Sequence, residues 1–440
     1  MFEHTCRCAL VALFLALSCG VTPALAAPRT VAGEYLVIFN VPSEAGLPVM
    51  EMVKTRRSQM GQMLSELQLP EEKVLRRYRH MPMIALQKQT AADMESLRQD
   101  PRVRAVYPNH LLYPHLSESL PLINQPLPAQ LGFGGQGAAV VIIDTGLDYT
   151  RTDFGSCTAP GDPAECRVKY AGDIAPDDGS RDDSGHGTNV GAIVASVADQ
   201  ADLIALDVFD GNTATLFDVL DAIYWAIDNQ ATYNIAVINL SLGDSSRFAS
   251  PCDDWKTNPY LDAVEHAREA GIVVIASAGN EGYSDGMGQP ACTLGAVSVG
   301  AVYDAAVGGV SYSSCTDVST AADQVACFSN SADYMTLWAP GSLITAGGAL
   351  MAGTSQAAPH VAGVAAVLRA TFPQESVDQA VARLTDSTAH VTDSRNGVTL
   401  PRLDEQQALG VTDFAVVPGA GRWAVFSTAL GLIILVKNFA

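Results

Sequence analysis

Five apolar runs of strand length recur through the middle of the chain, and the first of them, residues 138–143, is continuously hydrophobic rather than alternating. Continuous runs of this kind are typical of parallel strands buried on both faces. The five runs cover residues 138–143, 203–208, 235–240, 272–276 and 296–300. Segments with helical spacing lie between them, at 188–197, 216–229 and 260–270. This alternation predicts an α/β fold with a doubly wound, mostly parallel sheet flanked by helices, whose functional sites lie at the carboxyl ends of the strands.

A smaller unit precedes this sheet. Residues 33–114 are comparatively rich in Lys and Arg and contain no cysteine. Thr90, with Asp93 three residues later, is expected to cap a helix that runs to Arg98. Together with strands predicted at 34–39, 83–86 and 101–107 and a helix at 50–67, this gives a small α+β domain. Residues 116–136 are rich in Pro, Leu and Gln, and we interpret them as a linker that wraps a surface.

The N-terminus has the pattern of a secretory signal peptide. An apolar run from Ala9 to Ser18 is followed by Ala24-Leu25-Ala26, the small-residue spacing that signal peptidase accepts. We expect cleavage after Ala26. A lipoprotein signal that uses Cys19 is the alternative.

The C-terminus carries a second apolar run, Ala424 to Val436, between Trp423 and Lys437. The run is short for a spanning helix, although its flanking residues are those of membrane-interface anchors. We interpret it as a sorting or anchor segment, with a soluble core helix as the alternative. The predicted organisation is a signal peptide at 1–26, the α+β domain at 27–115, the main domain at 116–410 and the C-terminal segment at 411–440.

Composition narrows the class of protein. Hydrophobic residues make up 48% of the 440 residues and charged residues 17%, which allows a large core. The net charge of −21 argues against nucleic acid as a partner, because phosphate binding needs clustered Lys and Arg. Three of the nine cysteines lie in the signal segment, and the other six predict three disulfides in an exported domain. Nearness in sequence favours the pairs Cys157–Cys166, Cys252–Cys292 and Cys315–Cys327, one of fifteen connectivities.

Four polar residues stand where catalysis could use them. Asp144 directly follows a buried strand, His186 lies between two glycines at the start of a helix, and Asn280 follows another strand. Ser355 begins a helix rich in small residues, where backbone N–H groups and the helix dipole favour an oxyanion. Each also has an ordinary interpretation: a turn cap, a surface histidine, a Gly-Asn turn and a helix N-cap.

Taken in order and with their motifs, these four residues resemble the subtilisin-like serine proteases over residues 135–369. The matching segments are Val141-Ile142-Ile143-Asp144-Thr145-Gly146, Gly185-His186-Gly187-Thr188, Asn239-Leu240-Ser241-Leu242-Gly243, Ser277-Ala278-Gly279-Asn280, and Gly353-Thr354-Ser355 with Ala357-Ala358-Pro359-His360-Val361-Ala362-Gly363. The resemblance implies a serine endopeptidase that works through an acyl-enzyme, with Asp144, His186 and Ser355 as the triad. It implies Asn280 as the oxyanion-hole donor, and substrate-binding segments at Ser241, Leu242 and Gly243 and at Ser277, Ala278 and Gly279.

The same resemblance implies how the enzyme is made. Residues 27–115 are similar to the family's inhibitory propeptide, so we expect a zymogen that cleaves itself between Tyr113 and Leu120. The implied partners are polypeptide substrates and the chain's own propeptide. The predicted signal peptide and the cysteines, rather than the resemblance, give the expected location as extracellular or in the cell envelope, and the C-terminal segment leaves membrane attachment open.

Two residues depart from the family pattern. Asn189 stands where the family more often has a second histidine, and Gln356 replaces the commoner methionine, which puts the packing beside His186 in doubt.

We expect that the chemistry requires no cofactor. An acidic group could hold structural calcium, as family members often do, but a solvated acidic loop is the alternative. Its members are Asp173, Asp177, Asp178, Asp182 and Asp183.

Two other functions compete with a peptidase. The first is an inactive relative that binds extended peptides, and the complete set Asp144, His186, Asn280 and Ser355 argues against it. The second is an esterase that uses the same triad. The Gly-x-Ser-x-Gly elbow of such enzymes is absent around Ser355, and the order Asp, His, Ser differs from theirs.

Overall fold

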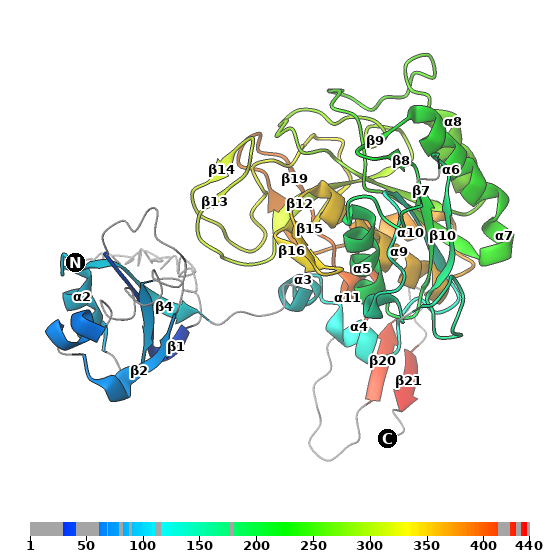
Figure 1. Cartoon of the computed structure of the whole chain (residues 1–440). Coiled ribbons are helices and arrows are strands. Elements are labelled where there is room, and N and C mark those ends of the chain that lie inside the picture. Colours follow the sequence, from blue (N-terminus) through cyan, green and yellow to red (C-terminus); the bar gives the residue numbers. More distant parts are fainter. Residues whose placement is uncertain are drawn as a thin grey trace, which may run out of the picture.

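The computed structural model describes two folded units and a C-terminal pair of strands (Figure 1). The described residues are 30–40, 61–67, 69–78, 82–87, 90–110, 116–155, 157–176, 179–411, 423–427 and 433–437. The predicted signal peptide, with Cys6, Cys8 and Cys19, lies outside them. Residues 111–115, within which the predicted self-cleavage region begins, lie outside them too.

The N-terminal unit is an antiparallel sheet of four strands in the order β2-β3-β1-β4, with a helix packed on it. Thr90 caps that helix in a reciprocal box with Asp93, as predicted. The side chains of Val37, Ile84 and Met94 are fully buried in its core. The elements are β1 (Thr30–Phe39), a 3₁₀ turn (Glu71–Lys73), β2 (Val74–Arg77), β3 (Met83–Leu86), α2 (Ala91–Arg98) and β4 (Val103–His110).

Two details of this unit differ from the sequence-based expectation. Strand β2 was not predicted, because at this edge of the sheet Leu75 and its neighbours Arg76 and Arg77 are exposed and carry no alternating apolar pattern. Of the helix predicted at 50–67, residues 61–66 are helical, and the part before residue 61 lies outside the described residues.

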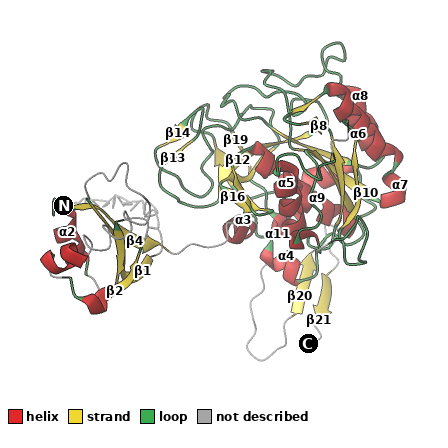
Figure 2. Ribbon diagram, viewed as in Figure 1, coloured by secondary structure: helices red, strands yellow, loops and turns green. Residues whose placement is uncertain are grey.

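The larger unit is built on a parallel sheet of seven strands, in the order β15-β12-β11-β10-β5-β7-β6 (Figure 2). The predicted α/β fold is therefore confirmed. All five predicted strands are present, and the two that the sequence did not reveal, β6 and β15, are the two edges. The strands are β5 (Ala139–Asp144), β6 (Val168–Asp173), β7 (Asp202–Asp207), β10 (Ile235–Leu240), β11 (Val273–Ser277), β12 (Val297–Tyr303) and β15 (Leu337–Ser342).

Helices cover both faces of this sheet. α5 (His186–Val197) and α9 (Thr354–Thr371) pack on one face, and α6 (Leu216–Asp228) and α8 (Leu261–Glu269) on the other. Strand β5 supplies Val140 and Ile142 to the first layer and Val141 and Ile143 to the second, which explains why its apolar run is continuous.

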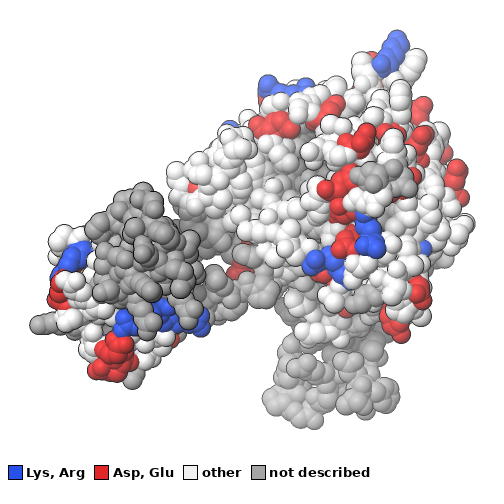
Figure 3. All heavy atoms as spheres, viewed as in Figure 1, with Lys and Arg blue, Asp and Glu red and all other residues white. Residues whose placement is uncertain are grey.

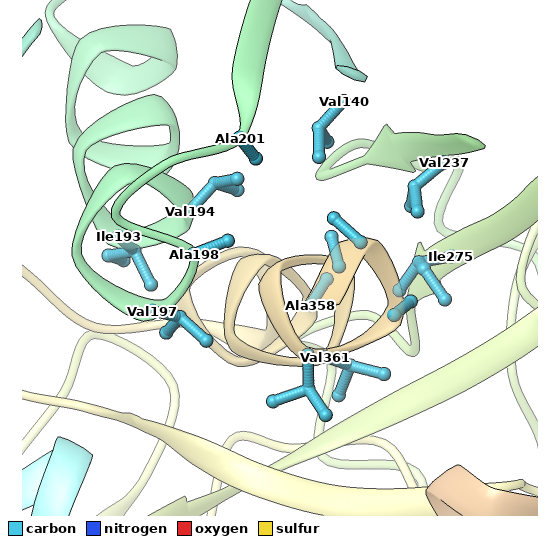
Figure 4. Close-up of a cluster of buried hydrophobic side chains, with 14 of the residues drawn as sticks. Val140, Ile193, Val194, Val197, Ala198, Ala201, Val237, Ile275, Ala358 and Val361 are labelled. Atoms are coloured by element: carbon cyan, nitrogen blue, oxygen red, sulfur yellow. The ribbon is translucent and has the colours of Figure 1, made fainter. Parts of the chain in front are cut away.

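Small residues let α5 and α9 pass close to each other. Figure 4 shows Val194 and Val197 of α5 against Ala358 and Val361 of α9, under side chains from three strands. A Cβ atom placed on Gly363 would lie 2.6 Å from the Cβ of Val197, so no larger residue fits at that crossing. The nucleophile candidate Ser355 thus begins a helix that is fixed by close packing along its length.

The segment predicted as a linker is helical and packed. It forms α3 (Leu116–Leu122) and α4 (Pro126–Gln130), so the linker interpretation is wrong. Ile123 is fully buried, and the Gln125 side chain donates to the carbonyl of Val197 at 3.2 Å. The linker interpretation relied on the prolines of this segment. Proline is tolerated in the first turn of a helix, however, and Pro126 lies there in α4.

The remaining elements are short and lie around the sheet. The helices are α7 (Gln230–Tyr233), α10 (Val377–Thr385), α11 (Glu405–Ala408) and a 3₁₀ turn (Thr152–Phe154). The two-stranded hairpins are β8–β9 (Phe209–Asp210, Thr213–Ala214), β13–β14 (Val310–Ser311, Thr316–Asp317), β16–β17 (Ile344–Ala346, Ala349–Met351) and β18–β19 (His390–Thr392, Thr399–Pro401).

The predicted disulfides are all present: Cys157–Cys166, Cys252–Cys292 and Cys315–Cys327. Acidic side chains outnumber basic ones over the visible face of the larger unit, consistent with the net charge of −21 (Figure 3).

The C-terminal apolar run forms two antiparallel strands, β20 (Trp423–Ser427) and β21 (Ile433–Lys437), so the alternative of a core helix is wrong. None of the helices in the described ranges is both long and apolar enough to cross a membrane. Attachment through this segment stays a prediction.

Candidate active site

The candidate residues gather at the carboxyl ends of the central strands. Asp144 is the last residue of β5, and it pairs in register with Asp207 at the end of β7. Ser241 directly follows β10, and Ser277 ends β11. In the sheet, β6 and β7 lie on one side of β5, and the strands that follow them in sequence, from β10 on, lie on the other. The strand order therefore reverses at β5, and an open α/β sheet binds its ligands at the carboxyl ends of the strands at such a point.

The central contact of the site joins Asp144 to His186. The imidazole Nδ1 of His186 lies 2.7 Å from Asp144 Oδ1, and the Asp144 side chain is 1% exposed. An ionised carboxylate only accepts hydrogen bonds, so Nδ1 carries the proton and Nε2 keeps its lone pair when the ring is neutral. The charge of Asp144 raises the pKa of His186, and burial of the ring opposes that rise.

Asp182 fixes the start of the helix that carries His186. Gly185, the N-cap residue of α5, has no side chain to cap the helix. The carboxylate of Asp182 accepts from the N–H of Gly185 at 2.8 Å and from the N–H of Thr188 at 2.7 Å. It also accepts from the Thr145 hydroxyl at 2.8 Å, which connects α5 to the residue after Asp144. Asp182 therefore caps a helix, a role that its place among the acidic residues did not suggest.

The described residues do not show a set of ligands for the predicted structural calcium. Among the described residues, no group of three or more His, Cys, Asp or Glu side chains is arranged to hold a metal ion. Asp177 and Asp178 lie outside those residues. Structural calcium stays a prediction.

Ser355 lies in the first turn of α9, after Gly353. Its hydroxyl donates to the carbonyl of Ser241 at 3.1 Å, and the Ser241 hydroxyl donates to the carbonyl of Ser355 at 2.8 Å. In the part of the chain that the structure describes, no hydrogen bond joins the Ser355 hydroxyl to His186. Such bonds are often long in an enzyme without substrate and form in the substrate complex.

Asn280 faces the same helix end with a defined orientation. Its Oδ1 accepts from the N–H of Thr354 at 2.8 Å and from the Thr354 hydroxyl at 3.1 Å. An N–H must meet an acceptor, so the oxygen of the amide faces Thr354 and Nδ2 is left as a donor. Asn280 is exposed, and no other described residue accepts a hydrogen bond from its Nδ2.

A buried residue that the sequence did not single out stabilises this loop. Asn330 is fully buried, and its Nδ2 donates to the carbonyl of Ala278 at 3.0 Å. Its backbone N–H donates to the carbonyl of Gly279 at 3.0 Å, and its Oδ1 accepts from the backbone N–H of Tyr283 at 2.9 Å. No local signal could have revealed this role, because it depends on a contact across about fifty positions.

The two predicted substrate-binding segments differ in their free backbone groups. The N–H groups of Leu242 and Gly243 donate to no other described residue, so this edge can pair with an extended peptide. The N–H groups of Ala278 and Gly279 are already used, by Val299 and by the Thr354 hydroxyl. The second segment, from Ser277 to Gly279, therefore has fewer free groups for main-chain pairing than the first.

Comparisons with known proteins identify the family to which the chain belongs. The model of the subtilase family, peptidase family S8, matches residues 135–410. A subtilisin-like protease of Coccidioides posadasii (strain C735) is 27% identical over 330 residues, 67% of this chain and 71% of that protein. Subtilisin-like protease 2 of Trichophyton equinum is 30% identical over 268 residues, 58% of this chain and 55% of its own length.

A thermostable alkaline protease of Halalkalibacterium halodurans is 29% identical over 340 residues, which cover 72% of this chain and 81% of that protein. A crystal structure of a cold-adapted subtilisin-like serine proteinase aligns with a TM-score of 0.48 at 25% identity, over 62% of this chain and 90% of the other. Because the family model covers more than half of the chain, the protein belongs to the subtilase family of serine-type endopeptidases.

We predict that His186 titrates above its ordinary range and that Asp144 causes this. In Asp144→Asn the imidazolium loses its charged partner while the partial burial of the ring remains, so the pKa of His186 should fall. The sign follows from the raised pKa: the interaction stabilises the fold at acidic pH, and its contribution is lost as pH rises through the folded pKa. Histidine NMR titration of Ser355→Ala, with and without Asp144→Asn, measures the change. The exposed His390 is the internal control, and equal His186 titrations in both variants would contradict the prediction.

Proposed function

We propose that this protein is an exported serine endopeptidase, made as a zymogen, in which Asp144, His186 and Ser355 form the catalytic triad. The observation that carries the proposal is the 2.7 Å contact between His186 and the buried Asp144. Ser355 lies in the first turn of α9, which is hydrogen-bonded to the helix of His186 through the neighbouring residue Gln356. Membership of the subtilase family supports polypeptide substrates.

In the proposed reaction, Ser355 attacks the scissile carbonyl and His186 Nε2 takes its proton. The hydroxyl has to turn from the carbonyl of Ser241, its partner in the free enzyme, toward the imidazole. His186 then protonates the leaving amine, and a water molecule repeats the sequence to hydrolyse the acyl-enzyme. Asp144 keeps the required tautomer and stabilises the imidazolium, and its bond to Nδ1 and its burial suit it to both tasks.

Two donors are available for the developing oxyanion. The free Nδ2 of Asn280 is one, and the backbone N–H of Ser355, near the positive end of the α9 dipole, is the other. Thr354 fixes the amide of Asn280 before substrate arrives, so little reorganisation is needed when charge develops. The unpaired N–H groups of Leu242 and Gly243 would hold the substrate backbone.

Export and zymogen processing rest on separate observations. The predicted signal peptide and the three disulfides favour an oxidising compartment outside the cytosol. An independent α+β unit precedes the catalytic unit, as expected for an inhibitory propeptide. An inactive peptide-binding relative is the competing hypothesis, and the reactivity of Ser355 separates the two.

Ser355 and Asn280 are predicted to fail in different ways. Wild-type protein should react with a serine-directed phosphonate and hydrolyse a peptide substrate, whereas Ser355→Ala should do neither. Asn280→Ala should lower kcat about 10²–10³-fold with little change in KM, a loss established for this donor in subtilisin itself. A folded wild type that neither reacts nor hydrolyses would favour the peptide-binding alternative. Label that persists in Ser355→Ala would disprove the assignment of the nucleophile.

We also predict where the mature protein begins. The Ser119 hydroxyl lies 3.1 Å from His360 of α9, and Leu120 packs against the main core, so a cut within α3 would remove contacts of the catalytic unit. Within the predicted range from Tyr113 to Leu120, we therefore expect the cut on the N-terminal side of Leu116. N-terminal sequencing of active secreted protein measures this, and Ser355→Ala should stay uncut. A mature start near Ala27 in active enzyme would refute self-processing.

A further inference from the structure

The two departures from the family pattern, Asn189 and Gln356, are in direct contact. Asn189 lies one turn after His186 in α5, and Gln356 directly follows Ser355 in α9. Gln356 Nε2 donates to Asn189 Oδ1 at 3.1 Å, and the side chains are buried, with whole-residue exposures of 2% and 0%. A single hydrogen bond therefore joins the helix of the candidate base to the helix of the candidate nucleophile.

The orientation of this amide pair follows from a third element. Asn189 Nδ2 donates to the carbonyls of Ala346 at 2.8 Å and Ala349 at 3.1 Å, which are both in the β16–β17 hairpin. Carbonyls only accept, so the nitrogen of Asn189 must face the hairpin and its oxygen must face Gln356. Gln356 is then the donor, and its Oε1 points the other way. That oxygen lies 3.1 Å from the position that a Cβ on Gly353 would take, next to the nucleophile turn.

The hairpin is itself packed tightly on α5 and leads into the nucleophile turn. A Cβ placed on Gly347, at the hairpin tip, would lie 2.7 Å from the carbonyl of Thr188, the residue before Asn189. The second strand of the hairpin ends at Met351, four positions before Ser355. Asn189 thus holds the chain segment that enters the nucleophile turn, as well as the side chain that follows Ser355.

The backbone of Gln356 extends the contacts toward the N-terminal end of the catalytic unit. Its carbonyl lies 2.8 Å from His360 Nδ1, and His360 Nε2 lies 3.1 Å from the Ser119 hydroxyl in α3. Burial lowers the pKa of His360 to about 4, so the ring is neutral at ordinary pH, donates through Nδ1 and accepts from Ser119. The buried chain of polar groups from Ser119 to the hairpin carries no charge.

We propose that Asn189 and Gln356 act as one positioning pair, which sets the distance between His186 and Ser355 by joining α5, α9 and the β16–β17 hairpin. Neither side chain is assigned a proton transfer. The inference rests on the proposed function, because it concerns the geometry of the proposed triad. Loss of Gln356 leaves the Oδ1 of buried Asn189 without its donor, and loss of Asn189 leaves the Nε2 of buried Gln356 with only the weak sulfur acceptor of Met351, 3.9 Å away. The two single losses should therefore disturb the same geometry.

A double-mutant cycle measures that coupling. Gln356→Met keeps the volume and unbranched shape of the side chain but removes the donor, and Asn189→Leu removes the contacts to Gln356 and to the hairpin. We expect each single variant to lower kcat about tenfold with KM within about twofold of wild type. The kcat of the double variant should be no lower than that of the less active single variant. Two independent sites would instead lower kcat about a hundredfold in the double variant.

Two controls lie on the same helices, away from the pair. The Ser196 hydroxyl in α5 donates to the carbonyl of Ala192, and the Thr371 hydroxyl in α9 donates to the carbonyl of Val367. Ser196→Ala and Thr371→Ala should keep wild-type kcat. All rates are normalised to sites titrated with a serine-directed phosphonate, so unfolded molecules do not count. If Asn189→Leu does not fold, Gln356→Met alone decides through its kcat and the acid limb of its kcat/KM profile.

The acid limb should shift in the pair variants and stay in place in the controls, because only the pair variants lose the bond that holds the helix of His186 to α9 and the hairpin. Single variants with wild-type kcat, losses that add, or a loss confined to KM would each overturn the positioning pair. These outcomes differ from failure of the proposed function, in which wild-type protein itself neither hydrolyses peptide nor takes the label.

Discussion

The contact between Asp144 and His186 is the constraint on which the site depends. A carboxylate that is 1% exposed is costly to keep ionised unless a partner compensates it, and the imidazole 2.7 Å away supplies that partner. The position of the carboxylate comes from β5, whose side chains are buried in both layers of the molecule. The position of the imidazole comes from α5, whose first turn is fixed by Asp182. The distance between the carboxylate and the imidazole therefore depends on how β5 and α5 are packed in the fold.

The other half of the site depends on one helix. α9 places Ser355 in its first turn, and its small residues allow the close crossing with α5 at Gly363. Asn280 reaches that turn through Thr354, and Asn330 fixes the loop of Asn280 from behind. Hydroxyl, imidazole and amide donor thus belong to separate elements that share one packed core. Small errors in this packing would misplace reacting groups, and misplacement of about 1 Å can cost about 10²-fold in rate.

Sequence reasoning recovered what depends on local pattern. Strands such as β5, buried on both faces, gave continuous apolar runs, whereas the edge strand β15 contains Pro340 and Gly341, which an edge tolerates and a local pattern disfavours. The candidate residues were recoverable because each lies in a short motif beside a strand end or helix start. The capping role of Asp182 and the contact of Asn189 with Gln356 were not, because both depend on which distant segments meet after folding. The family comparison identifies the class of protein, and the side-chain contacts indicate how this chain differs within it.

The central claim is that Ser355, His186 and Asn280 converge on one reacting group. A crystal structure of the protein with a phosphonate bound tests it most directly, because the adduct resembles the tetrahedral intermediate. The account predicts a bond from phosphorus to Ser355 Oγ and a phosphonyl oxygen about 3 Å from Asn280 Nδ2, with the His186 imidazole beside the ester oxygen. Phosphorus on a different residue, or an oxygen that points into solvent away from Asn280, would contradict it.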